Sequence, residues 1–101
     1  MSTEEKKEQK ILTVPNPRTV VEWTSYLAVG IAEGFEELHE EDYEDASFTP
    51  TDVLAEAWSI IIKYGLWKNL QGFFGRQVKV LIESDIMQPD GTINWEEIYG
   101  V

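Results

Sequence analysis

The most regular part of the hydrophobic and polar pattern is residues 49–67, which read TPTDVLAEAWSIIIKYGLW. Thr49 followed by Pro50 and Asp52 is typical of a capped helix start, because such side chains bond the free amides of a first turn. Gly65 is the residue type that commonly ends a helix in the left-handed conformation. Between these positions the polar residues, spaced by three and four, are only Glu56, Ser59 and Lys63. The pattern predicts a helix that is apolar around most of its circumference, so that the rest of the chain or a second copy must cover it.

A second helix is predicted from Asn16-Pro17 to about Leu38, since an asparagine cap followed by proline is another common helix start. Its expected apolar face has steps of three and four and consists of Val20, Trp23, Leu27, Ile31, Phe35 and Leu38. Gly30 and Gly34 lie four apart and lower the helix propensity. Their small size predicts close packing of this helix against the helix over residues 49–67.

Residues 71–86 carry a third apolar pattern. The apolar residues that recur at the spacing of a helix are Phe74, Val78, Leu81, Ile82 and Ile86. Within this segment, residues 77–83 also alternate between apolar and other positions as a strand would. We therefore predict a helix over residues 71–86 and leave strand structure at 77–83 open.

The last part of the chain is organised by a turn sequence, Gln88-Pro89-Asp90-Gly91-Thr92. The apolar residues on its two sides are expected to pair as a small hairpin, and residues 95–99 to form one helical turn. The fold class predicted is mainly α, with a three-helix core and a small C-terminal β-hairpin or turn. This order of elements is similar to that of a winged helix, in which a third helix lies beside a hairpin wing. We expect a charged flexible tail at residues 1–10 and a single helical domain at 11–101.

The composition is that of one folded domain of 101 residues, of which 43% are hydrophobic. The absence of cysteine excludes disulfides, thiolate zinc sites and cysteine nucleophiles. The first ten residues are polar after Met1, and no apolar run approaches the roughly 20 residues that span a bilayer. We expect a cytoplasmic protein without a membrane partner.

The net charge of −11 disfavours non-specific binding to nucleic acid or anionic membranes. Its distribution is uneven. Residues 33–56 contain ten acidic and no basic residues, whereas residues 57–82 contain no acid and four basic residues, Lys63, Lys68, Arg76 and Lys79. Either these two parts attract each other within the fold, or the basic segment faces an acidic partner.

Catalytic motifs are absent from the sequence. The single histidine, His39, lies in a run of carboxylates and is predicted to be an ordinary surface residue. The chain has no glycine-rich phosphate loop, nucleophile elbow or pair of metal-ligating histidines. We therefore expect a protein that is not an enzyme and that needs no cofactor.

Residues 90–97, DGTINWEE, resemble the second half of an EF-hand calcium loop. The resemblance places Asp90, Thr92 and Glu97 at ligand positions, with Thr92 acting through its backbone carbonyl. Ile86 and Gln88 stand where the first two acidic ligands of such a loop belong. A turn followed by a capped helical segment is the favoured interpretation, and a degenerate calcium site is a lesser alternative.

The number of large aromatic residues is high for so short a chain. Those expected to contribute to an interaction surface are Trp58, Trp67, Phe73, Phe74 and Trp95. We predict a small acidic interaction or regulatory module that binds a protein partner or itself, most simply as a homodimer. The alternative is a nucleic-acid-associated regulator similar to a winged helix, whose binding face would comprise Lys63, Lys68, Arg76 and Lys79.

Overall fold

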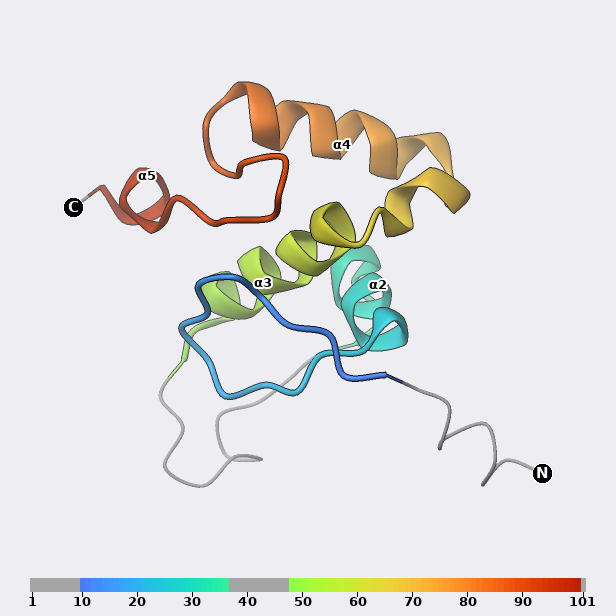
Figure 1. Ribbon diagram of the computed structural model, residues 1–101, viewed down its shortest axis with the longest axis horizontal. Coiled ribbons are helices and arrows are strands. Elements are labelled where there is room, and N and C mark those ends of the chain that lie inside the picture. Colours follow the sequence, from blue (N-terminus) through green and yellow to red (C-terminus); the bar gives the residue numbers. More distant parts are fainter. Residues whose placement is uncertain (1–9, 37–47, 101) are drawn as a thin grey trace.

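The computed structural model describes residues 10–36 and 48–100, and this part of the chain is mainly helical (Figure 1). The elements in chain order are α2 (Ser25–Glu33), α3 (Pro50–Lys63), the 3₁₀ helix η2 (Leu66–Asn69), α4 (Gly72–Glu83) and α5 (Trp95–Tyr99). Helix α3 runs through the middle of the molecule (Figure 1). On one side lie α4, α5 and their connection, and on the other lie α2 and the irregular segment 10–24.

Helix α3 begins and ends as its sequence predicts. The Thr49 hydroxyl accepts a hydrogen bond from the Asp52 amide at 3.1 Å, and the Asp52 carboxylate accepts one from the Thr49 amide at 3.2 Å. Gly65 has a φ of +67° and turns the chain out of the helix. The centre of α3 is fully buried at Ile60 and Ile61, so a single copy of the chain covers this helix on several sides.

The predicted helix from Asn16 to Leu38 is wrong over its first half, because among the described residues 16–36 only Ser25–Glu33 is helical. The predicted end at Leu38 lies outside the described residues. The amides of Arg18 and Thr19, which would belong to a first helical turn, donate to the carboxylate of Glu56 instead. The Asn16 side chain bonds the backbone of residue 93 and does not cap a helix. The helix starts only after Thr24, whose hydroxyl accepts from the Leu27 amide at 3.1 Å.

Neither glycine of α2 provides the predicted close packing against α3. A Cβ at Gly30 would lie 2.6 Å from Cγ of Glu36, whose side chain folds back over the helix. Gly34 has open space around its Cα and a φ of +87°, and it ends α2 in the left-handed conformation. Gly34 thus turns the chain at the end of α2, and Gly30 leaves room for the Glu36 side chain. As a result, Phe35 and Glu36 lie beside α2.

The segment 72–83 is a helix, which confirms the helical prediction and excludes a strand at residues 77–83. Its buried residues are Phe74, Val78 and Leu81, spaced by four and three. The helix ends at Ser84, and Asp85 follows with a φ of +63°.

The C-terminal hairpin is not formed: residues 84–94 contain a turn and a single antiparallel bridge between Met87 and Ile93. The Gly91 amide donates to the Gln88 carbonyl at 2.8 Å, closing the turn as predicted. The bridge is held by the Gln88 amide, which donates to the Thr92 carbonyl at 2.9 Å, and by the Asn94 amide, which donates to the Ile86 carbonyl at 2.8 Å. The N–H and C=O of Ile93 bond the side-chain amide of Asn16 instead. The described residues contain no strand, so the hairpin wing expected from the similarity to a winged helix is not formed among them.

Within residues 10–36 and 48–100, no helix is long and apolar enough to cross a membrane.

Candidate interaction surface

Two residues of the polar stripe of α3, Glu56 and Ser59, are buried, whereas Lys63 is exposed. Glu56 is completely buried, and its carboxylate accepts four hydrogen bonds from the segment 18–23. The donors are the amides of Arg18 (2.5 Å) and Thr19 (2.9 Å), the Thr19 hydroxyl (2.6 Å) and the Trp23 indole N–H (3.0 Å). With its oxygens saturated in this way, the carboxylate fastens the N-terminal segment to α3 and is not available to a substrate.

The next two residues of the stripe fasten other segments. The buried Ser59 hydroxyl donates to the Gly91 carbonyl at 2.5 Å, and the Lys63 ammonium donates to the Thr13 carbonyl at 2.9 Å. Gly91 has a φ of +92°, and a Cβ there would lie 2.9 Å from the Ser59 carbonyl oxygen. Glycine at position 91 therefore allows the turn to approach α3 this closely.

An open groove lies between α2 and the segment 64–70 that follows α3; we call it the α2–η2 groove. Its volume is about 490 Å³. Apolar side chains of Val29, Leu66 and Leu70 contribute to its lining, and the carboxylates at its edge are Glu33 and Glu36. Three aromatic residues that line it are unusually exposed: Phe35 at 80%, Tyr26 at 70% and Tyr64 at 41%.

A second groove, of about 390 Å³, lies between the end of α3 and α4; we call it the α3–α4 groove. Its apolar lining includes Ile62, Trp67 and Val78, and its charged residues are Lys63 and Lys68. The Lys63 ammonium lies 5.1 Å from the Tyr64 ring centre, and the Lys68 ammonium lies 5.9 Å from that of Trp67. Both cations are thus supported by aromatic faces.

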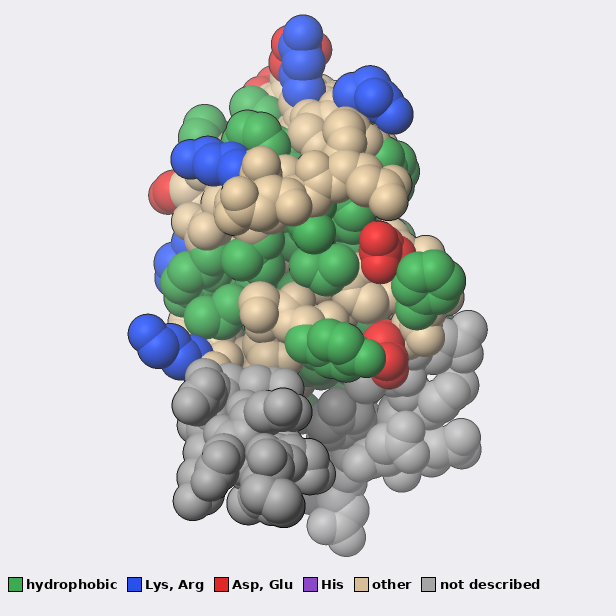
Figure 2. All heavy atoms as spheres, turned by 90° about the vertical axis from the view of Figure 1, so that its right-hand side faces the viewer, with side chains coloured by type: hydrophobic (Ala, Val, Ile, Leu, Met, Phe, Trp, Pro, Cys, Tyr) green, Lys and Arg blue, Asp and Glu red, His purple; other side chains and the backbone are tan. Residues whose placement is uncertain are grey.

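Figure 2 views the side of the molecule on which α2, η2 and the first turn of α4 lie. Apolar side chains extend across the middle of this face, two acidic side chains lie to the right of them, and Lys and Arg side chains lie at the top and along the left. The face therefore combines apolar surface with charges of both signs.

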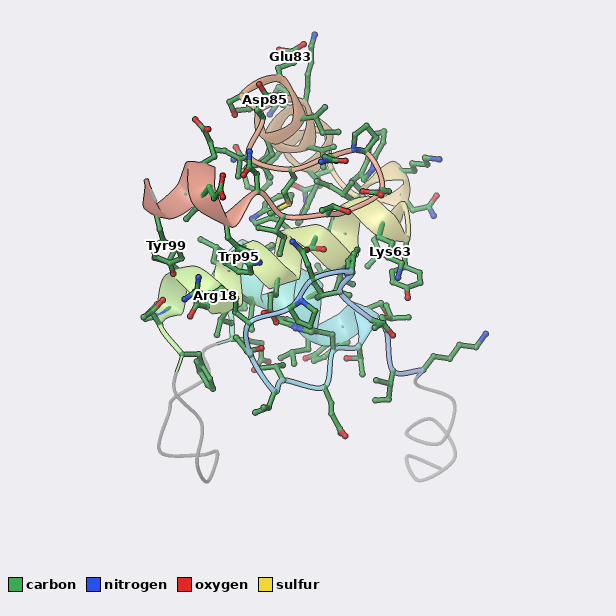
Figure 3. The ribbon with its side chains drawn as sticks, turned by 60° about the vertical axis from the view of Figure 1, so that its left-hand side comes forward. Arg18, Lys63, Glu83, Asp85, Trp95 and Tyr99 are labelled. Atoms are coloured by element: carbon green, nitrogen blue, oxygen red, sulfur yellow. The ribbon has the colours of Figure 1, made fainter. Side chains whose placement is uncertain are left out.

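Helix α5 is held by a cluster around Arg18 (Figure 3). The guanidinium carbon lies 5.3 Å from the Trp95 ring centre and 5.0 Å from that of Tyr99, and Arg18 Nε lies 3.7 Å from the Asp52 carboxylate. The Tyr99 hydroxyl donates to the same carboxylate, and this bond raises the pKa of Tyr99 because it favours the protonated phenol. Since these groups satisfy one another, the cluster serves to dock α5.

The predicted aromatic interaction residues are found in different surroundings. Trp58 and Phe74 are buried in the core, where their rings lie 5.7 Å apart, and Trp95 is part of the Arg18 cluster. Phe73 is 44% exposed on α4, and Trp67 lines the α3–α4 groove. The structure thus brings Trp58, Phe73 and Phe74 into one cluster of rings, whereas Trp95 lies apart from them in the Arg18 cluster.

The four basic residues of the predicted nucleic-acid face are also divided. Lys63 and Lys68 line the α3–α4 groove, whereas Arg76 and Lys79 lie on exposed positions of α4 outside both grooves. In the part of the chain that the structure describes, the one ion pair joins Arg18 and Asp52, so these four cations form none there. His39 and most of the acidic run lie outside the described residues.

The residues of the EF-hand-like stretch take part in the turn and the start of α5. The Asp90 carboxylate accepts a hydrogen bond from the Thr92 amide at 2.9 Å, which lowers the pKa of Asp90 by stabilising its charged form. The Thr92 carbonyl accepts from the Gln88 amide, and the Glu97 amide donates to the side chain of Asn94, the cap of α5. No group of three or more His, Cys, Asp or Glu side chains suited to a metal ion occurs in the described residues.

Sequence reasoning did not identify the α2–η2 groove. It placed Phe35 on a buried helix face, and it did not single out Tyr26 or Glu36. The one available signal was Gly34, because a glycine after an apolar helical pattern is typical of a helix end. Ending the helix there removes Phe35 from the buried face.

Comparison of this chain with protein-family models, with curated proteins and with solved structures found no match.

Proposed function

We propose that this protein is a small, non-catalytic interaction module that binds an apolar segment of a partner protein in the α2–η2 groove. The observation that carries this proposal is the gathering of exposed aromatic residues around one hollow. Tyr26, Phe35 and Tyr64 each leave between 41% and 80% of their surface in contact with solvent. Single exposed apolar residues are normal on proteins, but several around an apolar hollow are typical of a docking surface.

The charge of the groove favours a particular class of partner. Glu33 and Glu36 lie at its edge without an ion-pair partner among the described residues, and the whole chain carries a net charge of −11. A segment whose apolar residues are flanked by Lys or Arg would therefore be attracted over distance and oriented on arrival. An acidic segment would be repelled by the same carboxylates.

The polar groups of the interior support a non-catalytic role. A general acid or base must reach the proton that it transfers. The buried carboxylates of Glu56 and Asp52 accept hydrogen bonds from the protein's own amides, hydroxyls and indole. Their contacts are those of structural residues.

Self-association is a second form of the same function, and exposed residues of α4 favour it. Phe73 and Val80 lie seven residues apart, hence on one side of the helix, and are 44% and 55% exposed. A second copy is one partner that this face would accept as a homodimer. Light scattering at micromolar protein tests this form, since a monomer mass would exclude it at that concentration.

Selection from a displayed library of random peptides tests the proposed groove. The wild-type protein is compared with a Tyr26→Ser/Phe35→Ser variant, which removes two exposed groove residues with little expected effect on folding. The matched control is Ile11→Ser/Val20→Ser, because these residues are also exposed and apolar but line neither groove.

The proposal predicts a shared family of apolar peptides with Lys or Arg that the wild type and the control both enrich. The groove variant should enrich them at least about tenfold less. Equal enrichment by the groove variant, or no enrichment by any of the three proteins, would contradict the proposal.

A further inference from the structure

The two grooves meet at the end of α3. Tyr64 and Gly65 line both of them, so one short piece of backbone forms the ridge between the α2–η2 groove and the α3–α4 groove. Gly65 has a φ of +67°, and this left-handed residue carries the chain from α3 into η2. Leu66 then lines the first groove, while Trp67 and Lys68 line the second. The grooves are therefore neighbouring parts of one surface.

The charges of the two grooves are opposite. The α2–η2 groove has two carboxylates, Glu33 and Glu36, and the α3–α4 groove has two ammonium groups, Lys63 and Lys68. None of the four forms an ion pair within residues 10–36 and 48–100. Charged groups that have no ion-pair partner among the described residues and lie beside apolar hollows are suited to pair with a ligand.

The positions of three of these charged side chains are set by the protein. The Glu36 side chain packs over Gly30, where a Cβ would come within 2.6 Å of it. The Lys63 ammonium bonds the Thr13 carbonyl at 2.9 Å, and that of Lys68 lies over the Trp67 ring. Such supports reduce the side-chain ordering that binding would otherwise require.

We infer that the natural ligand is a dipolar peptide segment, which crosses the ridge at Tyr64–Gly65 and places basic residues beside Glu33 and Glu36 and acidic residues beside Lys63 and Lys68. Apolar residues between its two charged ends occupy the hollows. This inference rests on the proposed function and deepens it, because the partner then carries both signs of charge in a fixed order. A purely basic segment satisfies only half of the surface.

Three synthetic peptides with the same apolar residues and blocked ends test the inference. In the first, lysines precede and glutamates follow the apolar residues; the second carries only lysines and the third only glutamates. Fluorescence anisotropy measures the Kd of each for the wild-type protein and three variants. The variants are Glu33→Lys/Glu36→Lys, Lys63→Glu/Lys68→Glu and, as the control for net charge, Arg76→Glu/Lys79→Glu.

The wild type and the control should both bind the dipolar peptide at least about tenfold more tightly than either other peptide. The Lys63→Glu/Lys68→Glu variant should prefer the all-lysine peptide, and the Glu33→Lys/Glu36→Lys variant the all-glutamate peptide. Circular dichroism confirms that each variant is folded, and Lys68→Glu alone replaces the double variant if loss of the Lys63 contact to Thr13 unfolds it.

If the wild type binds the all-lysine peptide as tightly as the dipolar one, the net charge governs binding and the inference is wrong. The proposed groove would still stand on the displayed-peptide selection. Binding of none of the three peptides at millimolar concentration would also overturn the inference, whereas failure of that selection would overturn the proposed function itself. Equal changes in the Arg76→Glu/Lys79→Glu control would show that the position of the charges is unimportant.

Discussion

The polar stripe of α3 and the face formed by the two grooves differ in which groups they bury: the stripe buries polar groups, and the groove face exposes apolar ones. In the stripe, Glu56 and Ser59 are fully buried; Glu56 accepts hydrogen bonds from the segment 18–23, and Ser59 donates one to the Gly91 carbonyl. On the groove face, Tyr26 and Phe35 are exposed, and carboxylates such as Glu33 have no ion-pair partner among the described residues. Burying a polar group is costly unless it is hydrogen-bonded, and exposing apolar surface is costly unless something covers it.

This difference separates the structural residues from the candidate functional ones. In the sequence, the stripe is a carboxylate, a hydroxyl and an amine at helical spacing on an otherwise apolar helix. In the structure these groups hold three distant segments, beginning at residues 13, 18 and 91, against one helix. The groove face has no recognisable pattern in the sequence, yet in the structure its aromatic side chains are exposed and its charged groups have no ion-pair partner among the described residues. Variants of Glu56 and Ser59 should therefore change stability, and variants of the groove face should change binding. Lys63 belongs to both regions, so its variants should change both.

The largest expected effect is that of Ile61→Asp, which places a charge without a partner at a completely buried position of α3. The cost should exceed the stability of a small domain, roughly 5 kcal/mol or more, so the protein should not fold. Circular dichroism and urea titration measure this. A soluble variant with a cooperative transition would show that α3 is not the centre of the core.

Glu56→Gln tests the stripe itself. The amide keeps one acceptor oxygen, but its NH₂ group faces the donors that the second carboxylate oxygen now binds. We expect a loss of about 3 kcal/mol in the free energy of unfolding. The control is Glu22→Gln at an exposed position, which should change it by less than about 0.5 kcal/mol. Similar values for the two variants would mean that the carboxylate of Glu56 does not hold the N-terminal segment.

Gly91→Ala tests the close approach of the turn to α3. A Cβ at this position would lie 2.8 Å from Lys63 Cβ and 2.9 Å from the Ser59 carbonyl oxygen, in a backbone with a φ of +92°. We expect a loss of about 2 to 3 kcal/mol in urea titration. Gly100→Ala has a positive φ but open space around it, and should cost only about 1 kcal/mol. Equal losses would show that contact with α3 adds nothing to the backbone cost.

Tyr99→Phe removes the phenol that donates to Asp52 and should cost about 1 kcal/mol or less at neutral pH, since Tyr99 is partly exposed. The raised pKa of Tyr99 means that folding stabilises its protonated form. This contribution is present below pH 10 and is lost as the pH rises through the raised pKa, so the two proteins should converge in stability at strongly alkaline pH. The control is Tyr26→Phe, because Tyr26 is exposed and its hydroxyl makes no such bond to the described residues. A difference that stays constant with pH would contradict this role.

Sequence reasoning succeeded where local interactions determine the structure. The capping box at Thr49 and Asp52, the left-handed Gly65 and the helical steps of α4 all involve neighbours in the chain. It failed at residues 16–24, because Asn16 contacts Ile93 and the amides of residues 18 and 19 contact Glu56, across 37 to 77 positions. Such contacts leave no periodic pattern. The grooves were missed for the same reason, since they are formed by segments far apart in the chain.

An NMR titration of the ¹⁵N-labelled protein with the dipolar peptide tests the central claim most directly, because it observes the stripe and the groove face together. We expect the amide signals of residues that line the grooves, such as Tyr26, Phe35 and Lys68, to shift with added peptide. Signals of the groups bonded to the stripe, such as the Thr19 amide and the Trp23 indole, should remain in place. Shifts centred on Thr19 and Trp23, with the groove residues unchanged, would contradict the claim that the stripe is structural and the groove face binds the partner.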